Sequence, residues 1–360
     1  MTQRERQILQ LIEADPMIQQ QALADALGIT RSSVAVHISN LCKKGYIAGK
    51  GYVLRSGDYA VVVGGVNMDI GGHSFSPLVN ADSNPGSISM SLGGVGRNIA
   101  HNLALMGTDV RLLTAFGEDL YGQRIAASCG ELGIDVSHAL RTSELPTSTY
   151  LYIASPDGDM AMALSDMQIA DRITPAYLAA NLSILQNARV IVADTNIPPE
   201  SLVYLAENCQ APLFCDPVST TKAVKLLPIL QHIHTLKPNR LEASLLSGVE
   251  IREPKDVETA AKVLLDKGVQ RLFISMGADG VYAATKTESI FMPNLPGTPV
   301  NTTGCGDAFT AALVWAWLED LSLEETTLAG LAAGAIAMES AETINPAMNA
   351  SALKSRMQMK

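Results

Sequence analysis

The chain has 360 residues, 47% of them hydrophobic, no apolar run of the roughly 18 residues that span a membrane, and a polar start, so we expect a cytoplasmic protein. Its five cysteines are scattered without CxxC spacing, which argues against a disulfide framework or a zinc site. The net charge of -10 is uneven, because residues 1–57 hold seven basic and four acidic side chains, a net +3, which leaves -13 for the remainder.

Residues 1–57 predict three short helices followed by a small hairpin. Apolar side chains keep a helical period over 4–14 and 19–27, and Val34, Ile38 and Leu41 share one face of a third helix. The segment GYIAGKGYVL at 45–54 is typical of a wing. Residues 56–58 form a plausible linker, because a hydrophobic run restarts directly after them.

This arrangement resembles the winged helix-turn-helix DNA-binding domains. The resemblance implies that the third helix enters a DNA groove and presents Arg31, Ser32, Ser33 and His37 to operator DNA. The positive charge of residues 1–57 favours such a partner. The alternative is a three-helix segment that only packs on the rest of the chain or mediates dimerisation.

The run from Tyr59 to Val66 predicts a buried parallel strand that ends in polar residues. In an open α/β sheet, ligands bind outside the carboxyl ends of the strands, so Asn67 and Asp69 are candidates to hold substrate hydroxyls. The alternative is that Asp69 starts an ordinary turn. Residues 71–90 and 148–165 then predict short strands outside the main sheet, forming a small β lid.

The segment SLGGVGRN at 91–98 leads from glycines into a helix. Gly93 and Gly94 would let a ligand approach the backbone closely, and Asn98 can both donate and accept hydrogen bonds. A dinucleotide-binding fingerprint is disfavoured, because Ile99 replaces its third glycine. Further on, we interpret Gly117, Asp119 and Gly122 as structural turn residues.

The rest of the chain alternates between strands and helices. Apolar strand-like runs occur at 110–115, 189–194, 212–217, 232–238 and 271–277, with helical stretches between most of them. This βαβ rhythm predicts an α/β fold, a doubly wound and mostly parallel sheet with helices on both faces.

Residues 300–318, VNTTGCGDAFTAALVWAWL, predict a glycine-rich turn that opens into a buried helix. The amides of Gly304, Cys305 and Gly306 at the helix start would favour a bound anion. Asp307 beside them is suited to take a proton from a hydroxyl that attacks a phosphoryl group, although an unperturbed Asp, with a pKa near 4, is a weak base. The alternative is that Asp307 only caps the helix.

The TTGCGD and SLGGVGRN segments resemble two signatures of the PfkB, or ribokinase-like, carbohydrate and nucleoside kinases. The resemblance implies a ribokinase-like kinase domain over residues 58–360, with a lid that excludes water. It also implies that Asp307 is the catalytic base, that Asp69 grips a sugar diol, and that Asn98 contacts the sugar.

The same resemblance implies a site for ATP and Mg²⁺. Asn239 and Glu242, which are three residues apart and therefore on one face of a helical turn, would order the ion and the phosphates, with Glu242 acting through water. Ser275, Gly277 and Gly280 would lie along the nucleotide. Ordinary capping and turn chemistry is the alternative for these residues.

Two further positions leave the cofactor contacts open. Asn345 either edges the adenine pocket or belongs to a plain loop near the end of the chain. Asn301 stands where many family members have an acidic residue of a monovalent-cation site, so activation by K⁺ is left open.

Several segments, among them NADSNPGSI and HTLKPNRLEA, resemble bacterial pseudouridine kinases across most of residues 59–350. This implies phosphorylation of the 5′-hydroxyl of pseudouridine, with Asp69, Asn98 and Thr149 near the nucleoside. Kinases of inosine or guanosine, or of a sugar, are the alternatives within the family. A nucleoside-sensing regulator without activity is the alternative of another class, and a homodimer would suit a palindromic operator.

Overall fold

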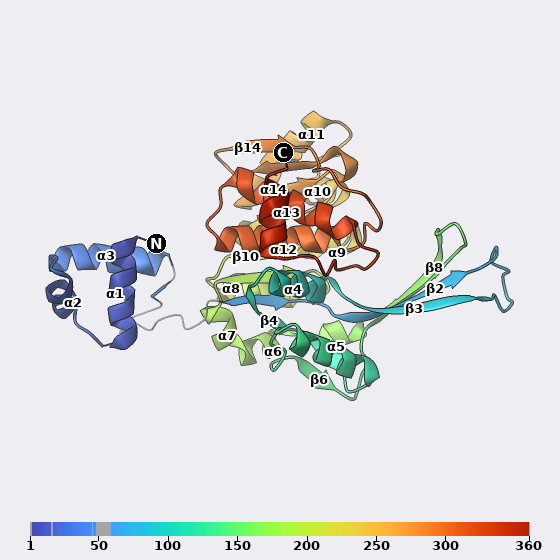
Figure 1. Cartoon of the computed structure of the whole chain (residues 1–360), viewed down its shortest axis with the longest axis horizontal. Coiled ribbons are helices and arrows are strands. Elements are labelled where there is room, and N and C mark those ends of the chain that lie inside the picture. Colours follow the sequence, from blue (N-terminus) through green and yellow to red (C-terminus); the bar gives the residue numbers. More distant parts are fainter. Residues whose placement is uncertain (1, 16, 45, 48–58, 360) are drawn as a thin grey trace. The chain divides into compact units, whose positions relative to one another are not determined.

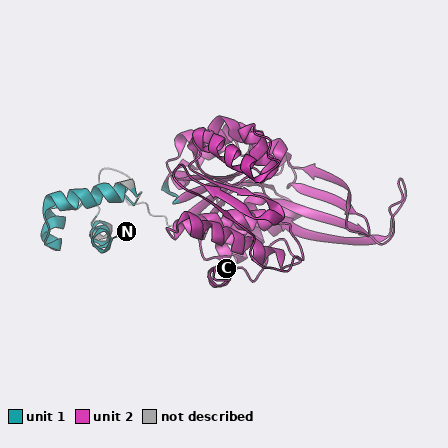
Figure 2. Ribbon diagram, turned by 90° about the horizontal axis from the view of Figure 1, so that it is seen from above, with its two compact units in different colours: residues 1–58, 187–189 teal, residues 59–186, 190–360 magenta. Residues whose placement is uncertain are grey.

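The computed structural model describes residues 2–15, 17–44, 46–47 and 59–359. Two compact units can be distinguished, residues 1–58 with 187–189 and residues 59–186 with 190–360 (Figure 2). The predicted wing at 45–54 lies largely, and the linker at 56–58 wholly, outside the described residues. In the described ranges no helix is long and apolar enough to cross a membrane.

The described part of the N-terminal unit contains three helices, α1 Gln3–Ala14, α2 Gln20–Leu27 and α3 Arg31–Lys43. The Thr30 side chain begins α3 by accepting the Ser33 amide at 3.2 Å, and Gly28 ends α2 at a φ of 61°, which glycine adopts readily. The core of the unit is apolar and consists of Ile8, Ile12, Leu23, Ala24, Val34, Ile38, Leu41 and Ile47. The three helices predicted from apolar spacing are confirmed.

The larger unit contains an eight-stranded sheet in the order β14-β13-β12-β11-β10-β9-β1-β4 (Figure 1). Its parallel strands are β1 Tyr59–Val63, β4 Asp109–Leu113, β9 Val190–Asp194, β10 Leu213–Asp216, β11 Ile233–Leu236 and β12 Arg271–Ser275. Two antiparallel strands, β13 Val281–Ala284 and β14 Ser289–Met292, complete one edge. The predicted mostly parallel sheet is confirmed. The antiparallel edge was not predicted, because the prediction depended on strands that alternate with helices and no helix lies between β13 and β14.

Both faces of the sheet are covered, because β1, β9 and β10 are buried at every position. Their alternate side chains pack against a core that includes residues of α4, α5, α12 and α13. The helices of the unit are α4 Val95–Leu105, α5 Leu120–Glu131, α6 Pro175–Ala180, α7 Leu182–Asn187, α8 Pro199–Asn208, α9 Thr220–Ala223, α10 Arg240–Ser247, α11 Pro254–Asp266, α12 Cys305–Leu318, α13 Leu323–Met338 and α14 Ala350–Met357, with 3₁₀ turns at Gln168–Arg172, Val224–His232 and Gly277–Asp279.

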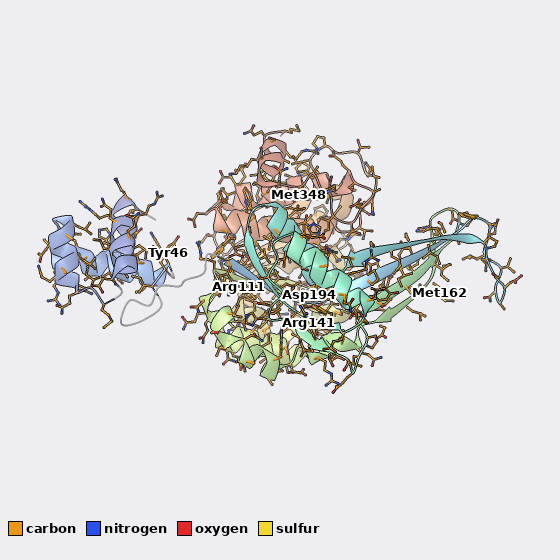
Figure 3. The ribbon with its side chains drawn as sticks, turned by 60° about the horizontal axis from the view of Figure 1, so that its bottom comes forward. Tyr46, Arg111, Arg141, Met162, Asp194 and Met348 are labelled. Atoms are coloured by element: carbon orange, nitrogen blue, oxygen red, sulfur yellow. The ribbon has the colours of Figure 1, made fainter. Side chains whose placement is uncertain are left out.

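A second sheet, which we call the lid, has the order β3-β2-β7-β8 and projects from the main sheet in Figure 1. Its strands are β2 Asn67–Ser74, β3 Gly86–Gly93, β7 Thr149–Ala154 and β8 Met160–Asp166. The lid carries exposed apolar side chains. They are Met162, which is labelled in Figure 3, and Ile88, Met90, Leu151, Ile153, Met160 and Leu164. The short strands β5 Ala115–Gly117 and β6 Leu140–Thr142 form a separate pair. The predicted lid strands are therefore confirmed.

Asp119 connects the lid to the start of α5. Its carboxylate accepts the Gly122 amide at 2.8 Å and the Thr147 amide at 2.7 Å. A Cβ atom at Gly122 would lie 2.0 Å from the Gly117 carbonyl oxygen, so only glycine fits there. These contacts agree with the structural role predicted for the three residues, because Thr147 leads directly into β7.

Candidate active site

Four neighbouring strands, β11, β10, β9 and β1, end at the same edge of the main sheet. The residues at or directly after their carboxyl ends are Lys237, Asp216, Asp194 and Gly64. In an open α/β sheet this edge is where ligands bind. The start of α12 also lies here, because a Cβ atom at Gly306 would be 3.4 Å from Lys237 Nζ.

Gly304 begins α12 with a φ of 83°, and a Cβ atom there would lie 2.3 Å from the Thr343 carbonyl oxygen. The three predicted anion-binding amides are not equivalent. The Cys305 amide donates to the Thr302 carbonyl at 3.3 Å, whereas within the described part of the chain the Gly304 and Gly306 amides have no acceptor. Gly304 and Gly306 therefore offer free donors at this turn, reinforced by the dipole of a fourteen-residue helix.

Asp307 lies in the first turn of α12 and is half-buried. Asn98 Nδ2 donates to Asp307 Oδ2 at 2.8 Å. Burial, together with the nearby Asp216 carboxylate, raises the pKa of Asp307 to about 7, against the opposing effects of Asn98 and Lys237. An unperturbed Asp would be a weak base, but burial brings the pKa of Asp307 close to the value that suits a general base at neutral pH.

Asn67 and Asp69 lie on β2 of the lid, and the Asn67 amide donates to the Asp69 carboxylate. Gly93 on the paired strand β3 leaves room for this carboxylate, because a Cβ atom there would lie 2.1 Å from Asp69 Oδ2. Burial raises the pKa of Asp69, while Asn67 and Arg97 oppose the shift. Thr149, at the start of the neighbouring strand β7, pairs with Met68.

Asn98 lies in the first turn of α4, directly after the glycine segment. Gly94 has a φ of 97°, and a Cβ atom there would lie 2.5 Å from the Gly65 carbonyl oxygen. Asn98 is buried, and in the described part of the chain its Oδ1 has no hydrogen-bond partner. Since buried polar atoms are normally paired, this oxygen is available to a ligand hydroxyl. The structure thus brings Asn98 and Asp307 together, as both predicted roles require.

Asn239 and Glu242 form a reciprocal capping box at the start of α10. The Glu242 amide donates to Asn239 Oδ1 at 2.9 Å, and the Asn239 amide donates to Glu242 Oε2 at 2.8 Å. Glu242 Oε1 and Asn239 Nδ2 take no part in this box. The described residues contain no group of three His, Cys, Asp or Glu side chains that could hold a metal. Glu242 Oε1 fits Mg²⁺, which keeps several waters and binds through few protein oxygens, whereas Asn239 Nδ2 can only donate a hydrogen bond to a bound water or phosphate.

The remaining predicted nucleotide residues lie in two loops. Ser275 ends β12, and its amide donates to the Pro238 carbonyl at 3.0 Å, which places it beside Asn239. Gly277 and Gly280 follow in a tight turn with φ values of 63° and 111°. Asn345 is used by its own loop, because Nδ2 donates to the Ile336 carbonyl at 2.6 Å and Oδ1 accepts the Ala347 amide at 2.9 Å.

Asp194, labelled in Figure 3, is a buried carboxylate that connects the segment after β1 to the start of α4. It accepts the Gly65 amide at 2.9 Å, the Gly96 amide at 2.7 Å and the Asn196 amide at 2.8 Å. It therefore holds the end of β1 against the first turn of α4, which carries Asn98. Burial raises the pKa of Asp194, while the hydrogen bonds from Gly65 and Asn196 oppose the shift.

Asp216 and Lys237 form a buried ion pair, with 3.4 Å between Asp216 Oδ2 and Lys237 Nζ. Burial favours the neutral amine, but the carboxylates of Asp216, Glu242 and Asp307 outweigh it and raise the pKa of Lys237. None of Asp194, Asp216 and Lys237 was predicted from the sequence as a site residue. Their signal is present in the sequence, since each directly ends or follows an apolar strand-like run, as in RVIVAD, PLFCD and HTLK.

In the N-terminal unit, Arg31, Ser32 and Ser33 are exposed at the start of α3, and both serine hydroxyls lie 2.9 Å from Thr30 Oγ1. His37 is half-buried, and its Nδ1 is buried with no partner among the described residues. The first three predicted DNA-contacting residues are thus accessible, whereas His37 is less accessible than they are. Val36 beside it is 59% exposed.

Two family models match the chain. A model of the pfkB family of carbohydrate kinases matches residues 58–350. The chain belongs to the pfkB family. A second model, of winged helix-turn-helix DNA-binding domains, matches residues 1–48. The family prediction made from the TTGCGD and SLGGVGRN motifs is therefore confirmed.

Two relatives from Escherichia coli (strain K12) match most of this pfkB kinase. The chain is 40% identical to the uncharacterized sugar kinase YeiI over 352 residues, which is 97% of each chain. It is 41% identical to pseudouridine kinase over 295 residues, covering 81% of this chain and 94% of that enzyme. The fold is shared with Arabidopsis thaliana ribokinase complexed with ribose and ATP, at a TM-score of 0.76 and 22% identity, covering 84% of this chain and 99% of that one.

These comparisons identify the chain as a nucleoside or sugar kinase, a phosphotransferase with an alcohol acceptor. Enzymes of the family use ATP as donor. The ribokinase-like fold, with a helix-turn-helix segment before the kinase domain, is confirmed as well.

Proposed function

We propose that this kinase transfers the γ-phosphoryl group of ATP to the 5′-hydroxyl of pseudouridine, with Asp307 as the catalytic base. The hydrogen bond from Asn98 to Asp307 carries this proposal, because it joins a buried amide that has an unpaired oxygen to a carboxyl whose pKa burial raises to about 7. The similarity to pseudouridine kinase supports the choice of nucleoside. The proposal places the reaction in the cytoplasm.

Each residue has one task in this mechanism. Asp69, fixed by Asn67, and Thr149 hold the ribosyl hydroxyls, while Asn98 Oδ1 accepts a further hydroxyl. Asp307 takes the proton of the attacking hydroxyl, and the Gly306 amide stabilises negative charge on the transferred group. Closure of the lid excludes water, which would otherwise accept the phosphoryl group.

The nucleotide would be held by the loops at Ser275, Gly277 and Gly280, and Mg²⁺ by Glu242 and Asn239, largely through water. When bound, the ion neutralises phosphate charge. Asn345 stabilises its own loop, because the nitrogen and the oxygen of its side-chain amide are both hydrogen-bonded to backbone groups.

The first experiment is an ATP- and Mg²⁺-dependent phosphorylation assay with pseudouridine, uridine, inosine, guanosine, cytidine and ribose, using Asp307→Asn as the control. We expect the highest kcat/KM with pseudouridine and near-complete loss in the variant. If the enzyme prefers a purine nucleoside or ribose, the proposed substrate is wrong but the proposed mechanism stands. No turnover with any acceptor would favour a nucleoside-sensing regulator instead.

We further propose that the N-terminal unit binds operator DNA through α3, with Arg31, Ser32 and Ser33 at the surface and His37 behind them. The exposed apolar side chains of the lid, including Met162 and Leu164, support a homodimer that covers them. A two-fold dimer would present two copies of α3 to the half-sites of a palindromic operator. Sedimentation and gel-shift measurements on the full chain test both points.

A further inference from the structure

Lys237 occupies an unusual position for a buried cation. It follows β11 directly and is only 7% exposed, yet a methyl group added at Gly306 would lie 3.4 Å from its ammonium nitrogen. The ammonium therefore lies against the turn that begins α12. This turn provides the free Gly306 amide and, one residue later, the carboxyl of Asp307.

The ion pair with Asp216 leaves donors of the ammonium unused. The 3.4 Å between Lys237 Nζ and Asp216 Oδ2 is longer than a well-formed charge-assisted hydrogen bond, at about 2.7–2.9 Å. Among the described residues, Asp216 is the carboxylate within 4.0 Å of this nitrogen. An ammonium has three N–H donors, so Lys237 can contact a further acceptor at the α12 turn.

Asp216 itself is held rigidly. Its Oδ2 accepts the Thr310 hydroxyl at 2.8 Å, and its Oδ1 accepts the Val218 amide at 2.9 Å. Val218 has a φ of +62°, a conformation that is costly for a β-branched residue and is maintained only where the surroundings require it. Asp216 thus fixes the position of the ammonium without saturating it. Burying such a pair would contribute little to stability by itself, which favours a role in the reaction.

We propose that Lys237 is a further catalytic residue, which contacts the transferred phosphoryl group while Asp216 and Thr310 hold it in position. This inference rests on the proposed phosphoryl-transfer site. The hydroxyl oxygen of the acceptor forms a bond to the γ-phosphorus, the bond from that phosphorus to the β,γ-bridging oxygen breaks, and ADP leaves. The hydroxyl proton goes to Asp307, and Lys237 remains an ammonium throughout. A fixed cation here stabilises charge on the equatorial oxygens.

The test compares the binding of two nucleotides by Lys237→Met. We would titrate the full chain with ADP and with β,γ-imido-ATP in the presence of Mg²⁺, by calorimetry, and measure kcat and KM with the best acceptor. We expect the affinity for β,γ-imido-ATP to fall by more than about tenfold while that for ADP changes little, and kcat to fall by about 10²–10³, as for other lost transition-state donors. Equal effects on both nucleotides, or none, would overturn the proposal.

Lys225→Met is the matched control. Lys225 also lies near the carboxyl edge of the sheet, but its ammonium donates to the Thr195 and Ile197 carbonyls at 2.9 Å each. Its removal should leave the ratio of the two affinities unchanged. A similar change of this ratio in Lys225→Met would show that loss of any nearby cation suffices, and would also overturn the specific role of Lys237.

Lys237→Met leaves the buried Asp216 carboxylate without its cation and can impair folding. The double variant Asp216→Asn with Lys237→Met removes both charges and keeps the side-chain volumes similar, and circular dichroism would check its fold. If the double variant binds β,γ-imido-ATP as well as the wild-type protein does, the inference is wrong. If the wild-type protein binds neither nucleotide, both the proposed function and this inference are wrong. If the wild-type protein binds both nucleotides and the Lys237→Met variant binds them equally well, only the inference is wrong.

Discussion

Asn98 Nδ2 donates a hydrogen bond to Asp307 Oδ2 at 2.8 Å across a separation of 209 residues in sequence. Asn98 belongs to the first turn of α4, and Asp307 belongs to the first turn of α12. The contact therefore joins the segment proposed to hold the nucleoside to the proposed base. Because one amide would contact both groups, this hydrogen bond would orient Asp307 relative to a hydroxyl bound by Asn98 Oδ1.

The rate should depend on pH through Asp307, whose pKa is raised to about 7 by burial and by Asp216. A base acts in its ionised form, so kcat/KM is expected to rise with pH through about 7 and then level off. Initial rates from pH 5.5 to 9 at fixed ionic strength would show this step. A flat profile across that range would contradict the assignment.

Asp307→Asn should abolish turnover and stabilise the fold at high pH. The folded pKa of about 7 lies above the ordinary Asp value of 3.8, so ionisation of Asp307 reduces stability as pH rises from about 4 to about 7, and the full cost is present above pH 7. Denaturant unfolding should show Asp307→Asn to be more stable than wild type at pH 8, with a smaller difference at pH 5. Lower stability of the variant at pH 8 would count against a raised pKa.

Asn98→Ala removes the contact to Asp307 and a ligand acceptor at once. We expect KM for the nucleoside to rise and kcat to fall by about 10²-fold, the lower range for a lost transition-state contact. Asn102→Ala is the control, because Asn102 is on the same helix but donates to the Asn98 carbonyl rather than to Asp307. If steady-state kinetics show the same loss of activity in both variants, Asn98 has only a structural role.

Potassium should not be required by the wild-type protein. Asn301 Nδ2 donates to the Ala341 carbonyl at 3.0 Å, and Oδ1 accepts the Thr303 amide at 2.9 Å, so a neutral amide already bridges these backbone groups. Asn301→Asp replaces that donor by a negative charge beside a carbonyl, an arrangement that favours a cation. We expect KCl to activate Asn301→Asp, but not wild type, relative to choline chloride. Activation of wild type by K⁺ would contradict this prediction.

Arg31→Ala should weaken binding of the full chain to its own operator region. Arg31 is exposed at the start of α3, and each lost phosphate contact lowers the salt dependence of log K by about 0.9. Fluorescence anisotropy at several salt concentrations measures this slope. Lys255→Ala removes an exposed charge of the kinase domain, at 75% side-chain exposure, and should leave the slope unchanged.

The sequence by itself was enough to predict the elements and the local motifs. Helical periods, buried apolar runs and the glycine-rich turn before Asp307 depend on neighbours a few residues apart, so the three N-terminal helices, the parallel strands and the start of α12 could be located. Asn239 and Glu242 were singled out through the family resemblance, with helix capping as the alternative, and the structure shows that the two residues form a capping box. The family resemblance also depended on such short segments.

The tertiary structure alone decided how the strand ends meet. Asp194, Asp216 and Lys237 end or follow strands that are far apart in sequence, and only the order β11-β10-β9-β1 makes them neighbours. Likewise, the pKa of Asp307 depends on burial and on Asp216, neither of which is visible near position 307 in the sequence. Electrostatic interactions act through space, so the chemistry of this site is determined by the packing of elements that the sequence specifies one at a time.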